Sequence, residues 1–282
     1  MFLEMSLLFM SVFAGILGSI LGLGGGIIVI PALTLIYGVN IRYAVGASIV
    51  SVIATSSGAA ASYVRDHLTN VRLAIFLEVG TTIGAITGAM IAAYVKSEFL
   101  FILFALLLLH SAYLMWQRGK QTEHSESTET TAHPWANYMQ LNSSYPDAVL
   151  KKDVPYLVQA VPVGFLYMLG AGLLSGLLGI GSGTLKVLAM DSAMKLPIKV
   201  SSATSNFMIG VTAAASAGAY YMRGDIIPAL AAPVALGVLL GSLLGAKLMV
   251  RLPAALIRKV FIIVLILVAV QMGLRGLGIR IG

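Results

Sequence analysis

Long apolar segments constrain the fold of this chain more than any other feature of its sequence. About 20 consecutive apolar residues are enough for a helix to cross the hydrocarbon core of a lipid bilayer, and the 282-residue chain contains eight such segments. Because only helices and closed barrels satisfy their own backbone groups in lipid, the sequence predicts an all-α integral membrane protein. The segments span residues 6–37, 43–64, 72–95, 98–116, 157–190, 200–221, 226–249 and 254–274.

Composition supports a membrane protein and narrows its partners. Hydrophobic residues make up 59% of the chain and charged residues only 10%, too few charges for a soluble surface. The net charge of +7 comes mostly from basic residues at segment ends, where anionic headgroups and the positive-inside rule place them. The chain has no cysteine, which excludes disulfides and thiolate metal sites. We therefore expect a multi-pass protein of the cell (plasma) membrane, a monomer or homodimer in the lipid bilayer, with no cofactor and no nucleic-acid partner.

The first and fifth segments are too long for single spans, and both contain a cluster of glycines. At about 1.5 Å per residue, roughly 32 residues in one helix reach about 48 Å, whereas the hydrocarbon core is about 30 Å thick. The clusters read "GLGGG" at Gly22–Gly26 and "GIGSG" at Gly179–Gly183. Each glycine inside a helix costs about 1 kcal/mol relative to alanine, so the clusters predict a break in each of these helices.

The two clusters belong to an internal repeat. A shift of 157 positions also aligns three polar pairs and two rows of glycines that have the spacing of closely packed membrane helices. The aligned residues are Gly22, Gly24 and Gly26 with Gly179, Gly181 and Gly183, Ser48 with Ser205, Thr55 with Thr212, Tyr63 with Tyr220, and Gly80, Gly84 and Gly88 with Gly237, Gly241 and Gly245. We therefore predict two repeated four-segment halves, a first membrane repeat at 1–116 and a second at 157–282, joined by a polar linker at 117–156.

The orientation of the halves depends on how the broken segments cross the membrane. If all eight segments cross, the repeats are parallel and both termini lie on the side of the linker, whereas re-entrant glycine hairpins change the parity and give inverted repeats. The sequence leaves both arrangements open, and in the first one the basic residues divide almost equally between the two sides. Within the linker, the residues around Pro146 and Asp147 are compatible with a small hairpin.

A broken helix in a membrane needs a polar environment. Lipid cannot satisfy its unpaired N–H and C=O groups, so such breaks persist only inside protein or beside a water-filled cavity. Paired breaks in repeated halves are typical of the binding site of a secondary transporter, near the middle of the membrane. The half-helices that begin at Ile27 and Thr184 would direct free N–H groups and a positive dipole end toward that cavity, which favours an anion.

These motifs resemble those of the TauE/SafE family of membrane transport proteins. The resemblance rests on "GSILGLGGGIIVIPAL" and "SGLLGIGSGTLKVLAM", each followed by a segment rich in Gly, Ala and Ser, and covers nearly the whole chain except the linker. It implies transport of small sulfur-containing anions such as sulfite, sulfoacetate or related organosulfonates. The halves differ chemically, which leaves the substrate open: Ser182 stands where the family often has glycine, and Lys186 and Leu188 stand where the first half has Val29 and Pro31.

The candidate substrate-binding residues gather around the two clusters and in the segments that follow them. Glycine N–H groups, serine and threonine hydroxyls and the Lys186 ammonium group can all donate hydrogen bonds to an anion. The alternatives are that Lys186 snorkels to the headgroups and that the hydroxyls cap helices or bond back to their own helix. The full set is Gly22, Gly24, Gly25, Gly26, Gly181, Ser182, Gly183, Thr184, Lys186, Ser48, Thr204, Ser205 and Asn206.

Glu78 is the only acid well inside a predicted span. A charge there is costly unless it is paired or hydrated, so an intramembrane carboxylate is a functional candidate. We expect Glu78 to couple transport to an ion, with H⁺ and Na⁺ as the candidates. The alternative is a structural ion pair with Arg72, six positions earlier in the chain.

Other classes of function fit the sequence less well. An intramembrane serine protease needs a Gly-x-Ser nucleophile and a histidine base on another helix, but Ile180 stands two residues before Ser182 and no catalytic or metal-binding set is recognisable. We therefore do not expect an enzyme. An anion channel of the same architecture and a transporter of another small anion, such as a carboxylate, stay open as alternatives.

Overall fold

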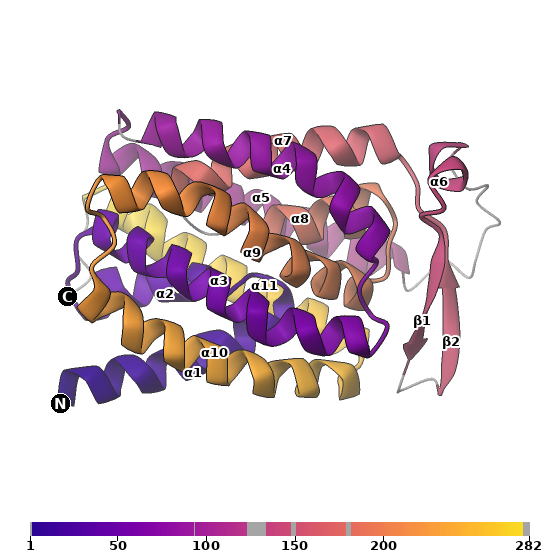
Figure 1. The fold of residues 1–282 in the computed structure, drawn as a ribbon, viewed down its shortest axis with the longest axis horizontal. Coiled ribbons are helices and arrows are strands. Elements are labelled where there is room, and N and C mark those ends of the chain that lie inside the picture. Colours follow the sequence, from indigo (N-terminus) through magenta and orange to yellow (C-terminus); the bar gives the residue numbers. More distant parts are fainter. Residues whose placement is uncertain (1, 93, 123–133, 148–150, 179–181, 279–282) are drawn as a thin grey trace.

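Helices make up most of the computed structural model, which describes residues 2–92, 94–122, 134–147, 151–178 and 182–278. They lie along the longest axis of the molecule, and a two-stranded hairpin lies at one end of it (Figure 1). The first helices are α1 Phe2–Leu21, α2 Gly26–Pro31, α3 Ile41–Arg65, α4 Val71–Ala92, α5 Ser97–Thr122 and α6 Pro134–Tyr138. Then follow β1 Ser143–Asp147, β2 Lys152–Tyr156, α7 Val161–Leu178, α8 Gly183–Leu188, α9 Ile198–Met222, α10 Pro228–Arg251 and α11 Ala254–Gly276.

Six helices in the described ranges are long and apolar enough to cross a membrane, which confirms the expected α-helical, multi-pass membrane protein. The other predicted segments are interrupted or more polar: α1 and α2 are separate helices, and α9 carries a run of polar residues between Ser201 and Asn206. A total of eight segments therefore stays a prediction. The six spans are Ile41–Arg65, Val71–Ala92, Glu98–Gln117, Val161–Leu178, Pro228–Arg251 and Ala255–Gly276.

The predicted break in the first segment is confirmed. Gly22, Gly24 and Gly25, which connect α1 to α2, have φ values of 71°, 74° and 70°, a region that suits glycine and strains other residues. Gly25 packs against α1, because a Cβ added to Gly18 would lie 2.5 Å from the Cα of Gly25. The chain therefore turns back along α1 instead of continuing across the bundle.

The fifth segment is interrupted as well. α8 begins directly after Ser182, which has a φ of 54°. Residues 179–181, which include the predicted site residue Gly181, lie outside the described residues. Beyond α8 the chain returns to the start of α7, because the N–H group of Gln159 donates a hydrogen bond to the carbonyl oxygen of Met194, 3.1 Å away.

Rows of glycines hold two pairs of helices in close contact, as their spacing predicted. A Cβ added to any of these glycines would meet backbone or side-chain atoms of the partner helix. The contacts are Gly237–Leu8, Gly241–Val12 and Gly245–Ile16 between α10 and α1, and Gly80–Phe165, Gly84–Leu169 and Gly88–Leu173 between α4 and α7. Residue numbers rise together along both partners, so the two helices of each pair run in the same direction.

The two ends of the bundle carry different parts of the chain. Both termini lie at one end, which we call the terminal end, and the hairpin lies at the other, the linker end (Figure 1). α1 enters from the terminal end and α2 returns to it, whereas α7 enters from the linker end and α8 returns there. The termini and the linker are thus on opposite sides of the bundle. This arrangement is expected if α1–α2 and α7–α8 are re-entrant, and not if all eight segments cross.

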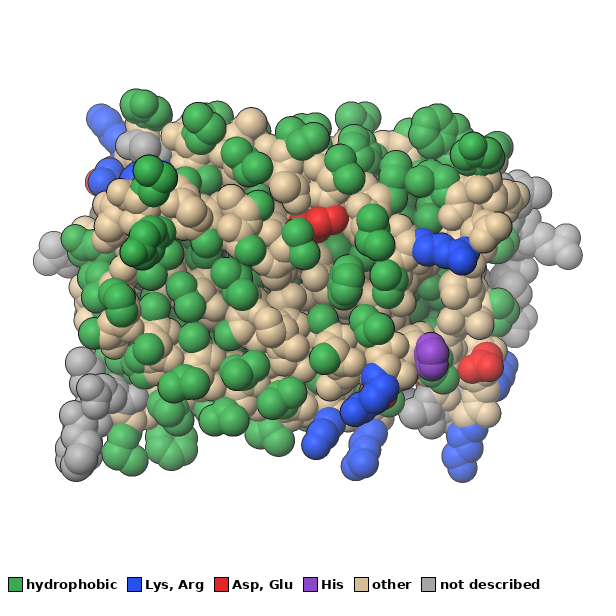
Figure 2. Space-filling model, viewed as in Figure 1, with side chains coloured by type: hydrophobic (Ala, Val, Ile, Leu, Met, Phe, Trp, Pro, Cys, Tyr) green, Lys and Arg blue, Asp and Glu red, His purple; other side chains and the backbone are tan. Residues whose placement is uncertain are grey.

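With this parity, basic residues concentrate at the linker end. The face in Figure 2 is largely apolar along its length, with basic side chains toward its ends. The equal division of charge expected for eight crossings is therefore not found. By chain order, the linker end has Arg65, Arg72, Arg118, Lys120, Lys151, Lys152, Lys195, Lys199, Arg251, Arg258 and Lys259, and the terminal end has Arg42, Lys96, Arg223 and Arg275.

The hairpin expected around Pro146 and Asp147 is confirmed, and an ion pair fastens it to the bundle. β1 and β2 pair in antiparallel register. The carboxylate of Asp147 lies 3.2 Å from the ammonium nitrogen of Lys199 in α9, and both side chains are buried. The hydroxyl of Tyr145 donates to the same carboxylate, and burial, together with this carboxylate, raises the pKa of Tyr145. The linker thus covers the end of α9 where this helix begins.

Candidate functional site

The two helix breaks meet in the middle of the bundle. Gly183, the first residue of α8, lies against the first break, since a Cβ added to it would be 2.7 Å from the Cα of Leu23. Gly24 lies between the central turns of α3 and α9, where an added Cβ would be 3.2 Å from Val52 and 2.6 Å from Ile209. Two segments far apart in the sequence therefore converge beside the central turns of α3 and α9.

Side chains of α3 and α9 donate hydrogen bonds to three backbone carbonyl oxygens at the first break. These carbonyl groups need hydrogen bonds because lipid supplies none. Two predicted site residues, Ser205 and Asn206, are thus bound to protein backbone, and Thr55 joins them. The bonds run from Ser205 Oγ to Gly22 O (2.7 Å), from Asn206 Nδ2 to Ser19 O (2.7 Å) and from Thr55 Oγ1 to Gly24 O (3.2 Å).

The backbone N–H groups at the start of α2 differ from the carbonyl groups of the first break in their hydrogen bonding. Those of Gly25, Gly26 and Ile27 donate no hydrogen bond to any other described residue, as expected for the first turn of a helix. They lie at the start of α2, where the helix dipole places its partial positive charge. Backbone of this kind can bind an anion.

The other predicted residues are more scattered. The hydroxyl of Thr204 accepts a hydrogen bond from the N–H group of Asn70, 3.1 Å away, so this residue faces α4 and not the break. Ser48 is buried on α3, and Ser182 is buried directly before α8. Thr184 lies in α8, and its side chain is outside the described part of the structure.

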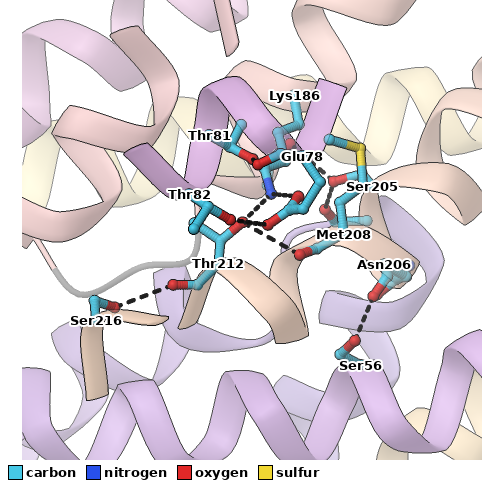
Figure 3. Close-up of polar contacts among 12 residues, drawn as sticks. Ser56, Glu78, Thr81, Thr82, Lys186, Ser205, Asn206, Met208, Thr212 and Ser216 are labelled. Atoms are coloured by element: carbon cyan, nitrogen blue, oxygen red, sulfur yellow. Dashed lines mark hydrogen bonds and ion pairs between the residues drawn. The ribbon is translucent and has the colours of Figure 1, made fainter. Parts of the chain in front are cut away.

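A buried ion pair lies beside the second break (Figure 3). The Nζ atom of Lys186 in α8 is 3.1 Å from Oε2 of Glu78 in α4, and it also donates to the hydroxyl of Thr212 in α9. That hydroxyl donates to Oε1 of Glu78 at 2.5 Å, and Thr82 donates to the same oxygen at 3.3 Å. Lys186 is 0% exposed and Glu78 is 9% exposed, so three helices hold the pair away from water.

This contact joins two residues for which the sequence predicted separate roles. The alternative that Lys186 snorkels to the surface is wrong, because its side chain is fully buried. The alternative that Glu78 pairs with Arg72 is also wrong, because the Arg72 guanidinium donates to the side chain of Gln140 at 2.8 Å. Any substrate that binds Lys186 must therefore compete with the Glu78 carboxylate, which already binds this lysine.

Neither of the two threonines that bond to the ion pair was singled out as a site residue from the sequence. Thr82 lies four residues after Glu78, and that spacing puts the two side chains on one face of a helix, so this contact had a readable signal. Thr212 was noted only as the repeat partner of Thr55. Its contacts come from α4 and α8, and no spacing within one helix reveals them.

Three cavities among the described residues lie at the ends of the bundle. One of about 70 Å³ opens at the terminal end and is lined by Arg42, Tyr220, Arg223, Asp225 and Leu177, among others. Two of about 440 Å³ and 570 Å³ flank the hairpin at the linker end. A solute in any of these three cavities does not touch the ion pair.

The sequence also matches known membrane proteins. The family profile described as "Sulfite exporter TauE/SafE" matches residues 7–272. The chain is 25% identical over 227 residues to the "Probable membrane transporter protein YunE" of Bacillus subtilis (strain 168), which covers 78% of this chain and 79% of that protein. It is 27% identical over 229 residues to the "Probable membrane transporter protein YdhB" of the same organism, over 79% and 81% of the two chains. No solved structure gives a significant match.

Proposed function

Because the chain belongs to the TauE/SafE family of membrane transporters, we propose that it is a secondary transporter of small sulfur-containing anions, such as sulfite, sulfoacetate or related organosulfonates. The family description names sulfite export, and both relatives are named as membrane transporters. One observation carries the proposal: two broken helices meet in mid-bundle, next to a buried lysine.

The membrane region is proposed to consist of two inverted repeats, residues 1–116 and 157–282, joined by the linker at 117–156. The helices pack reciprocally, with α1 on α10, α7 on α4, α3 on α9 and α5 on α11. Equivalent hydrogen bonds recur at the offset of 157. They run from the Tyr63 hydroxyl to Ser19 O at 2.9 Å and from the Tyr220 hydroxyl to Gly176 O at 2.7 Å. Inverted repeats give one broken helix to each side of the membrane, an arrangement found in many transporters that work by alternating access to a central site.

The anion is proposed to bind where the breaks meet. Side chains of α3 and α9 already bond carbonyl oxygens there, whereas the N–H groups of Gly25–Ile27 have no acceptor among the described residues. Donors are thus left for a ligand, and a sulfite or sulfonate group offers several oxygen acceptors to them and to the Lys186 ammonium group. The surrounding wall is proposed to include Gly22, Gly24, Gly181, Ser182, Gly183, Thr184, Ser48, Ser205 and Asn206.

Transport is proposed to be coupled to an ion through Glu78. The carboxylate is buried in the first half of α4 and contacts the lysine proposed to bind substrate. A group that can gain or lose a charge at the substrate site links the two events directly. The sequence leaves H⁺ and Na⁺ as candidates, and the arrangement of the ion pair bears on the choice.

Counterflow in proteoliposomes tests the proposed function. Vesicles loaded with unlabelled isethionate, a simple sulfonate, are expected to take up labelled isethionate transiently against its gradient, and sulfite, sulfoacetate and taurine are expected to compete. Flux without saturation or counterflow would favour an anion channel of the same architecture. Competition by small carboxylates and not by sulfonates would assign the protein another anion.

A further inference from the structure

The charge of Lys186 is already neutralised inside the protein. Its ammonium group lies 3.1 Å from one oxygen of Glu78, and Thr212 bonds to both partners. Glu78 therefore occupies the position that an anionic ligand of this lysine needs. The transporter proposed above has to free the lysine before the lysine can serve a substrate.

Electrostatics restricts how the lysine can be freed. If an anion approached Lys186 while Glu78 stayed ionised, two negative charges would share one positive charge in a site with little access to water. Like charges at such short range disfavour ionisation of one of the two groups, as in paired carboxylates that share a proton. A sulfonate is the anion of a strong acid, so the group that takes the proton is the carboxylate.

The geometry lets Glu78 become neutral without losing all its partners. Thr212 and Thr82 both donate to Oε1, the oxygen that does not contact the lysine. A protonated carboxyl group keeps that acceptor and gains a donor of its own, so it can move off the ammonium group and stay hydrogen-bonded. Two of the three N–H bonds of Lys186 have acceptors in the described part of the chain, and both point to this cluster.

We propose that the transported anion replaces the Glu78 carboxylate on Lys186 and that Glu78 takes up one proton as it leaves the lysine. This inference rests on the proposed function and specifies its coupling ion and stoichiometry. On loading, the carboxylate and a proton form a neutral carboxylic acid. On unloading, the same O–H bond breaks and the proton leaves on the side where the anion leaves, so one proton crosses the membrane with each anion.

The surroundings of Glu78 leave Lys186 as the group that controls its charge. α7, which packs on α4, has Tyr167 as its one titratable side chain, and that residue is 44% exposed. On α9, Lys199 is paired with the hairpin at the linker end, the Tyr220 hydroxyl donates to the carbonyl oxygen of Gly176, and Tyr221 is exposed. On α4 itself, Arg72 bonds to the linker. A sodium ion is a poorer coupling ion here, because the carboxylate it would bind lies 3.1 Å from an ammonium group that repels it.

Transport of isethionate under a proton gradient tests the inference. Isethionate stays a monoanion from mildly acidic to mildly alkaline pH, so its own titration does not intervene. With the membrane potential held at zero, one proton per monoanion predicts about tenfold accumulation for one unit of pH difference, because one pH unit is a tenfold proton ratio. Glu78→Gln is expected to show exchange that no longer depends on pH and no accumulation. The matched variant Glu98→Gln, at an exposed acid near the start of α5, is expected to accumulate tenfold like the wild type.

The outcomes separate this inference from the proposed function. Accumulation by Glu78→Gln at the wild-type level, or accumulation driven by sodium in place of protons, would overturn the inference and leave anion transport intact. A wild-type protein that neither binds nor exchanges isethionate, sulfite or sulfoacetate would overturn the proposed function, and this inference with it.

A second measurement uses the wild-type protein alone and does not depend on how a variant folds. Isethionate is added to the purified protein in weakly buffered detergent solution with a pH indicator. Uptake of about one proton per bound anion is expected from the exchange of charges at Lys186. Binding without uptake of protons would overturn the inference.

Discussion

Lys186→Met removes the cation from the buried ion pair and keeps a side chain of similar length. The Glu78 carboxylate then has no positive partner, while its two threonine donors stay in place. Loss of one member of a buried pair costs about 3–5 kcal/mol, and the surviving hydrogen bonds place the expected loss near the lower figure, about 3 kcal/mol. For a chain of this size that corresponds to a fall in Tm of roughly 6–12 °C.

The second part of this prediction is that removing both charges restores the stability lost in Lys186→Met. Replacing a whole buried ion pair with neutral groups is often close to neutral in stability. Lys186→Met combined with Glu78→Gln is therefore expected to unfold within about 1 kcal/mol of the wild type, which gives a coupling free energy of at least about 2 kcal/mol between the two positions.

Thermal unfolding in detergent, followed by the fluorescence of the two tryptophans, measures both effects. Lys247→Met is the matched control, since Lys247 is exposed on α10 and its loss should change the free energy of unfolding by less than about 0.5 kcal/mol. Anion affinity, measured on the same samples, should fall far more for Lys186→Met than for the control. Wild-type stability in Lys186→Met, or a double variant whose loss of stability equals the sum of the two single losses, would show that the two charges do not stabilise each other.

Three further predictions address the breaks and the orientation. Gly25→Val forces a branched side chain to a φ of 70° beside the free N–H groups, so it should abolish anion binding in a protein that still inserts. Gly84→Ala, in a row of packing glycines, should instead lower Tm before it lowers anion affinity. Binding and thermal-unfolding assays on both variants check this. Tyr63→Phe and Tyr220→Phe each remove one hydrogen bond to a carbonyl group near the end of the helix before a break, so each should cost about 1 kcal/mol, and clearly unequal losses in thermal unfolding would count against equivalent halves. The basic linker end should face the cytoplasm under the positive-inside rule. Lys152→Cys in this cysteine-free chain should therefore react with an impermeant thiol reagent only in inside-out vesicles. Labelling of intact cells would show that the linker end faces outward instead.

The helices and the first break could be predicted from the sequence because they depend on local properties. Apolar length predicted the spans, and the preference of glycine for positive φ predicted the break, where Gly22, Gly24 and Gly25 all have such values. The hairpin expected around Pro146 and Asp147 is also present, although both residues lie in β1, paired with Asp153 and Lys152. In each of these cases the determining interactions lie within a few residues in the chain.

The direction of the chain after each break could not be predicted. Apolar length does not distinguish a half-helix that continues across the membrane from one that turns back. The packing of Gly25 against Gly18 decides the direction for α2, and the hydrogen bond from Gln159 to Met194 decides it for α8. Both are tertiary contacts, so the sequence left parallel and inverted repeats equally open.

Several residues of the candidate site could be singled out from the sequence, but the contacts between them could not. Lys186 and Glu78 were both singled out because charges are costly in a membrane. They are 108 positions apart, and their contact depends on how α4 and α8 both pack against α7 and α9. Ser205 and Asn206 were expected to face a substrate, whereas they bind the nearest carbonyl groups of the broken helix. Polar side chains in an apolar surrounding bond to the closest free backbone group, and sequence alone does not show which group that is.

The claim that an anion binds where the two broken helices meet is tested most directly by a structure with a heavy oxyanion. Selenite resembles sulfite, and its selenium gives an anomalous X-ray signal that locates the bound ion independently of the protein atoms. We expect a selenium position in mid-bundle within hydrogen-bonding distance of the Lys186 ammonium group, with the Glu78 carboxylate moved away from it. Selenium found only in the terminal-end cavity beside Arg42 and Arg223, with the Lys186–Glu78 pair intact, would contradict it.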